Sequence, residues 1–444
     1  MRRLAVALAC AGASAAVVMA SPASAVPQVG AAPQASAVSP AGSPAPSASP
    51  PRAAAGRGGA VETGPRAPYR PDDGTTILQQ VPARRDPAVR NLSALRAALD
   101  ADRRDLHAAA ALARAYIDFG RQVGDAHYAG YAEAVIAPWM AAADPPVVAE
   151  VLQATILQFR HQFDDARALL VRALRRDPRD AQAWLTMATL DTAQGRYDAA
   201  RKACAEVARN GGEVVGIACL ASVRMSTGQA REASVMLRRI DADAAGTSGE
   251  YAAWIEGLAA EASERLGAWA DAERHYRKAL AAAPADNFLL VAYADFLLDR
   301  GRAREVGPLL AASWQSDTAF LRIVLAEAAL GAPDAARDTF LMAARFAALQ
   351  QRGSDYYGRE QVRFALHLEH DPQAALALAL QNWNVQRAPW DARVALEAAK
   401  AADRPGDVAG VLAFVAQTRL QDPVIEVLAA ELRARLARTR EARQ

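Results

Sequence analysis

The sequence predicts an all-α fold, an α-solenoid of stacked antiparallel helix pairs with about eight to nine repeats and terminal capping helices. The first observation is a period of thirty-four residues over which side-chain type is kept: Phe163 becomes Tyr197, Ala166 becomes Ala200, and Leu170 becomes Cys204. A period of this length is typical of stacked helix pairs. The second observation is composition, because 52% hydrophobic and 6% aromatic residues suit helices that approach closely through small side chains.

The breaks between helices have the chemistry that such an array needs. Gly195 supplies a turn, and Pro178 ends a helix because proline has no N–H for the next hydrogen bond. Ala188 and Ala200 fall where two antiparallel helices approach most closely, and Tyr197 fills the gap beside them. Spacing, side-chain size and turn chemistry therefore agree.

This stretch resembles the tetratricopeptide repeat, whose pattern runs from an aromatic through small residues, a turn glycine and a tyrosine to a closing proline. The residues that carry the resemblance are Trp184, Met187, Ala188, Gly195, Tyr197 and Ala200, with Ala166, Leu170, Ala173 and Pro178 in the unit before. The resemblance implies a right-handed superhelix whose concave groove binds an extended peptide or a protein partner. It does not say which partner.

The N-terminus reads as an export signal over residues 1–25. Arg2 and Arg3 give a basic start, an apolar run follows, and Ala23-Ser24-Ala25 forms an A-x-A cleavage site. We expect an exported protein, in the periplasm or secreted, with no membrane span after cleavage; a retained anchor is the alternative. Residues 26–75 are rich in Ala, Pro and Ser and predict a disordered linker.

The repeat domain is expected over residues 86–440. A capping helix from Pro87 to Asp100 precedes the first repeat, in which residues 121–127 are expected to form an elaborated loop. Gly267 and Gly301 mark two strictly spaced repeats in the middle of the domain. The other repeats and the final helix are expected at residues 146–178, 180–209, 213–241, 317–349, 355–384, 388–418 and 422–438.

Charge and motif content argue against several functional classes. The chain has 51 basic and 49 acidic residues, intermixed along the helices, so no nucleic-acid footprint stands out. No nucleophile elbow, phosphate-binding loop, zinc motif or dinucleotide fingerprint occurs in the repeats. We therefore expect no cofactor, no metal and no catalytic site. Glu261 and Glu264 share a helix face, as two catalytic carboxylates do, but a solvated acidic face is the simpler interpretation.

The resemblance also implies which side chains line the groove, because the family uses fixed positions of each first helix. Polar residues are expected in the early and middle repeats and carboxylates in the later ones. The groove candidates are Arg114, Asp118, Gln158, Gln182, Thr189, Thr192, Trp254, Glu261, Glu264, Asp295 and Asp299. We expect the four carboxylates to steer a basic or mixed-polarity segment in a salt-dependent manner.

Cys204 and Cys219 are the two cysteines left after signal cleavage, and they predict a disulfide. Export places them in an oxidising compartment, and their midpoint falls at Gly211, in the turn between two antiparallel helices. The pair should therefore lie at the same height on facing helices. Two buried free cysteines are the alternative.

The sequence thus predicts an exported, non-enzymatic scaffold or adaptor that binds a protein partner in the cell envelope. An assembly or export factor for an envelope polysaccharide or a surface appendage is the second hypothesis. An enzyme with an unrecognised site is the third. Oligomeric state is not predicted.

Overall fold

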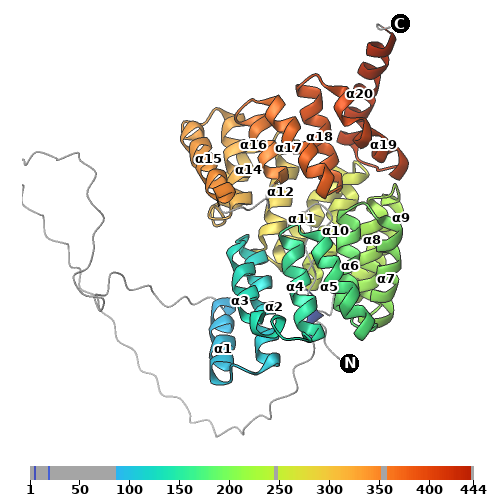
Figure 1. Ribbon diagram of the computed structural model, residues 1–444. Helices are drawn as coiled ribbons and strands as arrows, with labels where there is room; N and C mark the ends of the chain where they lie inside the picture. Colours follow the sequence, from blue (N-terminus) through green and yellow to red (C-terminus); the bar gives the residue numbers. More distant parts are fainter. Residues whose placement is uncertain (1–4, 7–18, 21–86, 245–248, 352–357, 442–444) are drawn as a thin grey trace, which may run out of the picture. The chain divides into compact units, whose positions relative to one another are not determined.

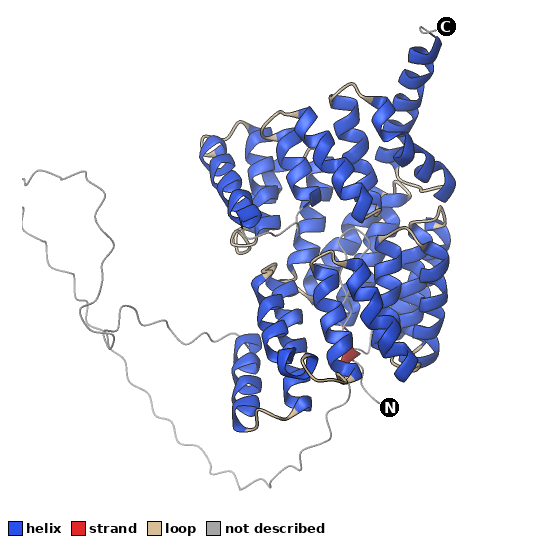
Figure 2. Cartoon of the chain, in the orientation of Figure 1, coloured by secondary structure: helices blue, strands red, loops and turns tan. Residues whose placement is uncertain are grey.

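The structure is a computed structural model that describes residues 5–6, 19–20, 87–244, 249–351 and 358–441. In these ranges the chain is helical apart from two short strands, β1 (Ala5–Val6) and β2 (Met19–Ala20), which pair antiparallel (Figure 2). Except for these strands, the expected signal peptide lies outside the described residues. The expected linker lies wholly outside them.

Consecutive helices pack against each other in pairs, in chain order (Figure 1). A first helix, α1 (Pro87–Ala101), precedes four pairs in the N-terminal part. These pairs are α2 (Leu106–Val123) with α3 (His127–Met140), α4 (Val147–Phe159) with α5 (Phe163–Arg176), α6 (Ala181–Ala193) with α7 (Tyr197–Gly211), and α8 (Glu213–Met225) with α9 (Ala230–Ala244).

Five further pairs follow, the second of which has a short partner made of a 3₁₀ turn, η1 (Ala303–Glu305), and α13 (Val306–Leu310). Pro308 has no N–H to donate to the carbonyl four residues earlier, so α-helical bonding is delayed there. The remaining elements are α10 (Gly249–Arg265), α11 (Trp269–Ala282), α12 (Asn287–Asp299), α14 (Asp317–Leu330), α15 (Ala335–Gln351), α16 (Gly358–His367), α17 (Pro372–Val385), α18 (Pro389–Ala401), η2 (Pro405–Val408), α19 (Ala409–Thr418) and α20 (Pro423–Glu441).

Within the described residues, the helices from α2 to α19 make nine pairs, with α1 and α20 at the ends. The predicted fold class, an all-α solenoid of stacked helix pairs, is confirmed. Each repeat range expected from the sequence coincides with one pair to within a few residues.

The expected loop at residues 121–127 is wrong. Helix α2 continues to Val123 because Arg121 and Gln122 are ordinary helix formers. Gly124 then adopts φ 68°, a left-handed conformation that glycine reaches without steric cost, and its N–H bonds back to the last turn. The connection to α3 is therefore a tight turn.

The small residues of the repeat pattern lie where the helices touch. Ala166, Ala188 and Ala200 are fully or almost fully buried, and Tyr197 is buried beside them. Asp180 caps the N-terminus of α6 by accepting a hydrogen bond from the backbone N–H of Ala183 at 2.8 Å. Side-chain size thus sets the spacing of the helices, as the repeat pattern predicts, and the Asp180 cap sets where α6 begins.

Helix pairs that are distant in sequence also meet, at the turns of the array. The backbone N–H of Arg387 donates to the carbonyl of Ala193 at 2.7 Å. A Cβ atom added to Gly195 would lie 2.8 Å from the ring of Phe414, on α19. Arg121, near the end of α2, forms an ion pair with Asp286, just before α12, at 3.3 Å. The first two contacts place C-terminal helices against the third repeat, and the Arg121–Asp286 pair places α2 beside the start of α12.

Candidate functional site

The structure brings the four predicted carboxylates of the later groove into one region. Glu261 and Glu264 lie on α10, and Asp295 and Asp299 lie on α12. Arginines from later helices reach this region, so its charge depends on residues that are remote in sequence.

Asp295 is buried between two arginines. Its carboxylate accepts two hydrogen bonds from Arg322 on α14, at 3.0 and 2.8 Å, and one from Arg363 on α16 at 2.6 Å. Burial alone would raise the pKa of Asp295, but the two guanidinium groups outweigh it and hold this pKa well below its usual range. Arg322 is only 1% exposed, so the group is an internal ion-pair network.

Asp299 is held by Arg393 of α18. Both carboxylate oxygens accept from this guanidinium at 2.6 Å, and Nε of Arg393 donates to Glu397 at 2.8 Å. The guanidinium carbon of Arg393 also lies 4.3 Å from the ring centroid of Trp390, a cation–π distance. Burial would lower the pKa of Arg393, but these carboxylates raise it above its usual value. The arginine therefore already has two anionic partners.

Arg265 neutralises the third carboxylate. It donates to Glu261 at 3.0 Å and to Asp422, just before α20, at 2.8 Å. The other oxygen of Asp422 accepts the first backbone N–H groups of α20, so this residue is a helix cap as well as an ion-pair partner. Helix α20 is thereby tied to α10.

Glu264 is different, because among the described residues its carboxyl group accepts one hydrogen bond, from the hydroxyl of Tyr276 on α11. Burial raises the pKa of Glu264 to about 8, against the effect of the Tyr276 hydrogen bond and with support from the charge of Asp299. Its carboxyl group is thus protonated in the folded protein at neutral pH.

Glu264 faces a cavity of about 70 Å³. The polar part of the wall consists of Glu261, Glu264, Arg265, Tyr276, Arg393 and Asp422. The apolar part is made by Gly257, Phe288, Leu289, Ala292 and Trp390. A space of this size exceeds several-fold the roughly 10–15 Å³ that one water molecule requires, so it can hold the head group of a side chain.

None of the polar candidates of the early repeats is among the residues that line this cavity. Arg114 is partly buried, and burial lowers its pKa despite the charges of Asp180 and Asp118. The side chain of Gln158 is fully buried, and neither of its amide atoms has a hydrogen-bond partner.

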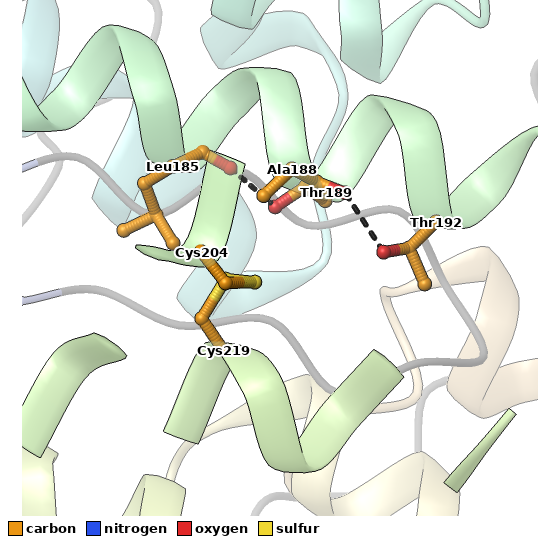
Figure 3. Close-up of a disulfide and its surroundings, with 6 residues drawn as sticks. All are labelled: Leu185, Ala188, Thr189, Thr192, Cys204 and Cys219. Atoms are coloured by element: carbon orange, nitrogen blue, oxygen red, sulfur yellow. Dashed lines mark hydrogen bonds between the residues drawn. A yellow bond between two sulfur atoms is a disulfide. The ribbon is translucent and has the colours of Figure 1, made fainter. Parts of the chain in front are cut away.

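The candidates of the third repeat are bonded within their own helix. Thr189 donates to the carbonyl of Leu185 at 3.0 Å, and Thr192 donates to that of Ala188 at 2.8 Å (Figure 3). Gln182 donates to Thr186 at 3.1 Å. These three side chains therefore donate hydrogen bonds within their own helix rather than to a partner.

Trp254 does not line the cavity. It is 3% exposed and packs in the hydrophobic core with Tyr251 and Ile255. The cavity is lined instead by Tyr276, Phe288 and Trp390, and the sequence prediction did not include Trp390.

Cys204 on α7 and Cys219 on α8 form a disulfide (Figure 3). Their Cα atoms are 5.5 Å apart, and the bond closes a segment with a sequence separation of 15. It joins the second helix of the third pair to the first helix of the fourth.

Sequence reasoning missed the arginines that later helices bring to this site, although the chain carries a signal for them. Each first helix of the last three pairs has an inward arginine: Arg322 on α14, Arg363 on α16 and Arg393 on α18. Their regular occurrence could have indicated partners for the carboxylates of α10 and α12. The open acidic stripe expected from the sequence is, in the structure, largely internal ion pairs.

Two other kinds of site are not found among the described residues. No group of three or more His, Cys, Asp or Glu side chains there is placed to hold a metal ion. Among the described helices, none combines the length and the apolar character that a membrane span requires.

Short turns, small residues between helices and pairwise stacking define the class of protein as a helical-repeat protein. The family profile described as "Tetratricopeptide repeat" matches residues 160–213, which include the whole of α5, α6 and α7. These residues are therefore a tetratricopeptide-repeat segment within the array of helix pairs. Among curated proteins, none matches.

Several solved structures are similar to this chain. One is described as "Crystal structure of APC/C hetero-tetramer Cut9-Hcn1", with 11% identity and a TM-score of 0.39, covering 78% of this chain and 52% of that one. The chain thus spans about half the length of that relative. Yeast Tom70 has 10% identity and a TM-score of 0.31, with 80% and 93% covered. The P58(IPK) TPR domain has 12% identity and a TM-score of 0.20, with 79% and 94% covered. Sequence identities and TM-scores this low do not indicate which ligand or partner this chain binds.

Proposed function

We propose that this chain is an exported, non-enzymatic scaffold that binds a protein partner in the cell envelope, in the periplasm. The observation that carries the proposal is the tetratricopeptide-repeat match within a continuous array of helix pairs. Such repeats are typically interaction scaffolds, because stacked pairs present one extended surface to a partner.

Export is supported by two independent features. The first 25 residues have the basic, apolar and A-x-A order of a secretory signal. The Cys204–Cys219 disulfide is the second feature, since disulfides persist in oxidising compartments and are rare in the cytosol. Fractionation of cells, with N-terminal sequencing of the mature chain, tests export: a mature start at Val26 is expected, and an uncleaved cytosolic chain would contradict it.

Partner binding is best tested by photo-cross-linking in intact cells. Phe288 lines the cavity and is only partly buried, so a benzoylphenylalanine at this position keeps the native ring and reports on anything bound there. Phe340 on α15, which is 73% exposed, takes the same replacement and serves as the matched control.

A discrete protein adduct from position 288, with none from position 340, is expected. Adducts from position 340 alone would move the contact surface to α15, and no protein adduct at either position would contradict the scaffold proposal. Recovery of glycan-bearing adducts would favour the second hypothesis, an envelope polysaccharide assembly or export factor.

A further inference from the structure

The cavity beside Glu264 has an uneven charge balance. Its two lining cations are both matched, Arg265 by Glu261 and Asp422, and Arg393 by Asp299 and Glu397. In the part of the chain that the structure describes, Glu264 is the carboxyl group in this set with no arginine or lysine hydrogen-bonded to it, and it accepts a hydrogen bond from Tyr276. An anionic ligand would therefore meet no unmatched cation, whereas a cationic ligand would meet an unmatched carboxyl group.

Size and geometry narrow the kind of cation. In the part of the chain that the structure describes, His, Cys, Asp and Glu side chains do not converge on a metal-binding position. The volume of about 70 Å³ suits one side-chain head group. The walls of Phe288 and Trp390 add aromatic faces, which attract ammonium and guanidinium groups and pack against their methylenes.

We propose that the cavity between α10, α12 and α18 binds the cationic head group of one lysine or arginine side chain from the partner, with Glu264 as its counter-ion. This inference rests on the proposed scaffold function, and it specifies what the bound segment must contain. The two lining arginines are each paired with a carboxylate, Arg265 with Glu261 and Arg393 with Asp299, and these pairs keep the charge of the wall near balance.

Binding of a cation is coupled to loss of a proton. Burial raises the pKa of Glu264 to about 8, so at neutral pH the group enters the reaction as a carboxylic acid. Insertion of the cation forms an ion pair with the carboxylate and releases one proton to solvent. The charged groups that face Glu264 are Glu261 and Arg265 on α10, Asp299 on α12, Arg393 on α18 and Asp422 before α20, and Tyr276 on α11 donates to it. Affinity is thus expected to rise with pH up to about 8.

Calorimetric titration of the purified full chain tests the site without knowledge of the partner. The probes are N-acetyl-arginine amide and N-acetyl-lysine amide, with the neutral citrulline and norleucine derivatives as controls. At least one cationic probe is expected to bind with a Kd on the order of millimolar, and the matching neutral probe about tenfold or more weakly. Titration in two buffers of different ionisation heat should show release of up to one proton.

Two variants locate the binding. Glu264→Gln keeps the shape and removes the charge, and it is expected to weaken the cationic probe about tenfold or more and abolish proton release. Ala292→Met leaves every charge in place and fills the cavity, so it should also weaken binding, which guards against loss of folding in the first variant. Glu232→Gln, at an exposed carboxylate on α9, is the matched control and should change nothing.

Equal binding of arginine and citrulline probes, or unchanged binding to both site variants, would overturn the inference. The two proposals fail separately. If a protein partner cross-links at position 288 but neither cationic probe binds, the scaffold proposal is supported and the cation site is contradicted. If a cationic probe binds but no protein cross-links, the cation site is supported and the scaffold proposal is contradicted.

Discussion

Asp295→Asn is the substitution that best separates an internal ion pair from a partner-binding carboxylate. The change removes the negative charge between Arg322, which is 1% exposed, and Arg363, which is 7% exposed. Breaking a buried pair leaves an uncompensated charge and typically costs about 3–5 kcal/mol. Here the carboxylate accepts three hydrogen bonds from two guanidinium groups, so we expect a loss in this range.

The assay is urea unfolding of the variant and the wild type, followed by circular dichroism. Asp198→Asn is the matched control, because Asp198 is an exposed residue whose side chain is 89% accessible and pairs with Arg201 on the surface. An exposed pair is worth about 0–1 kcal/mol. A cost below about 1 kcal/mol for Asp295→Asn would refute the internal role of this carboxylate.

The pH dependence gives an independent check of the same ion-pair network. The folded pKa of Asp295 is depressed, so its stabilising contribution is fully present above the unfolded value of about 4 and is lost as pH falls below it. The variant should therefore differ least from the wild type in acid.

Three further predictions follow from particular contacts. Glu264 has a raised pKa in the folded protein, so its contribution to stability has the opposite sign and should fall as pH rises from about 4.5 to about 8. In urea titrations, Glu264→Gln should remove on the order of 1–3 kcal/mol of that fall, and a variant with the wild-type pH profile contradicts this. Gly195→Ala should lower the free energy of unfolding by about 2–3 kcal/mol, because φ is 72° and the new Cβ meets Phe414. Gly301→Ala, at φ 70° with open space around it, should lower it by about 1 kcal/mol, and equal losses would show that Phe414 plays no part. Reduction of the Cys204–Cys219 bond, or the double change of both to Ser, should lower stability by about 3 kcal/mol for a loop of 15 residues, and two thiols that alkylate in unreduced exported protein would show that the bond is not formed.

What the sequence determines in this protein is local. The thirty-four-residue period, the small residues at Ala188 and Ala200, and the turn at Gly195 predict helix pairs because size and backbone freedom act between neighbours in the chain. The Cys204–Cys219 pairing is local in the same sense, since a hairpin of two helices relates residues on either side of its turn. The error at residues 121–127 is also local: the insertion lengthens helix α2 and leaves only a short turn.

What only the tertiary structure decides is how distant repeats neutralise one another. Helical periodicity puts Asp295 and Asp299 on an inward face, but it does not say that Arg363, 68 residues away, and Arg393, 94 residues away, reach them. Whether these side chains meet depends on small rotations from one helix pair to the next, which accumulate along the array. A local sequence pattern does not determine the accumulated rotation. The cavity beside Glu264 exists only because α18 and the start of α20 come to lie against α10 and α12, which brings Trp390 and Asp422 to its wall.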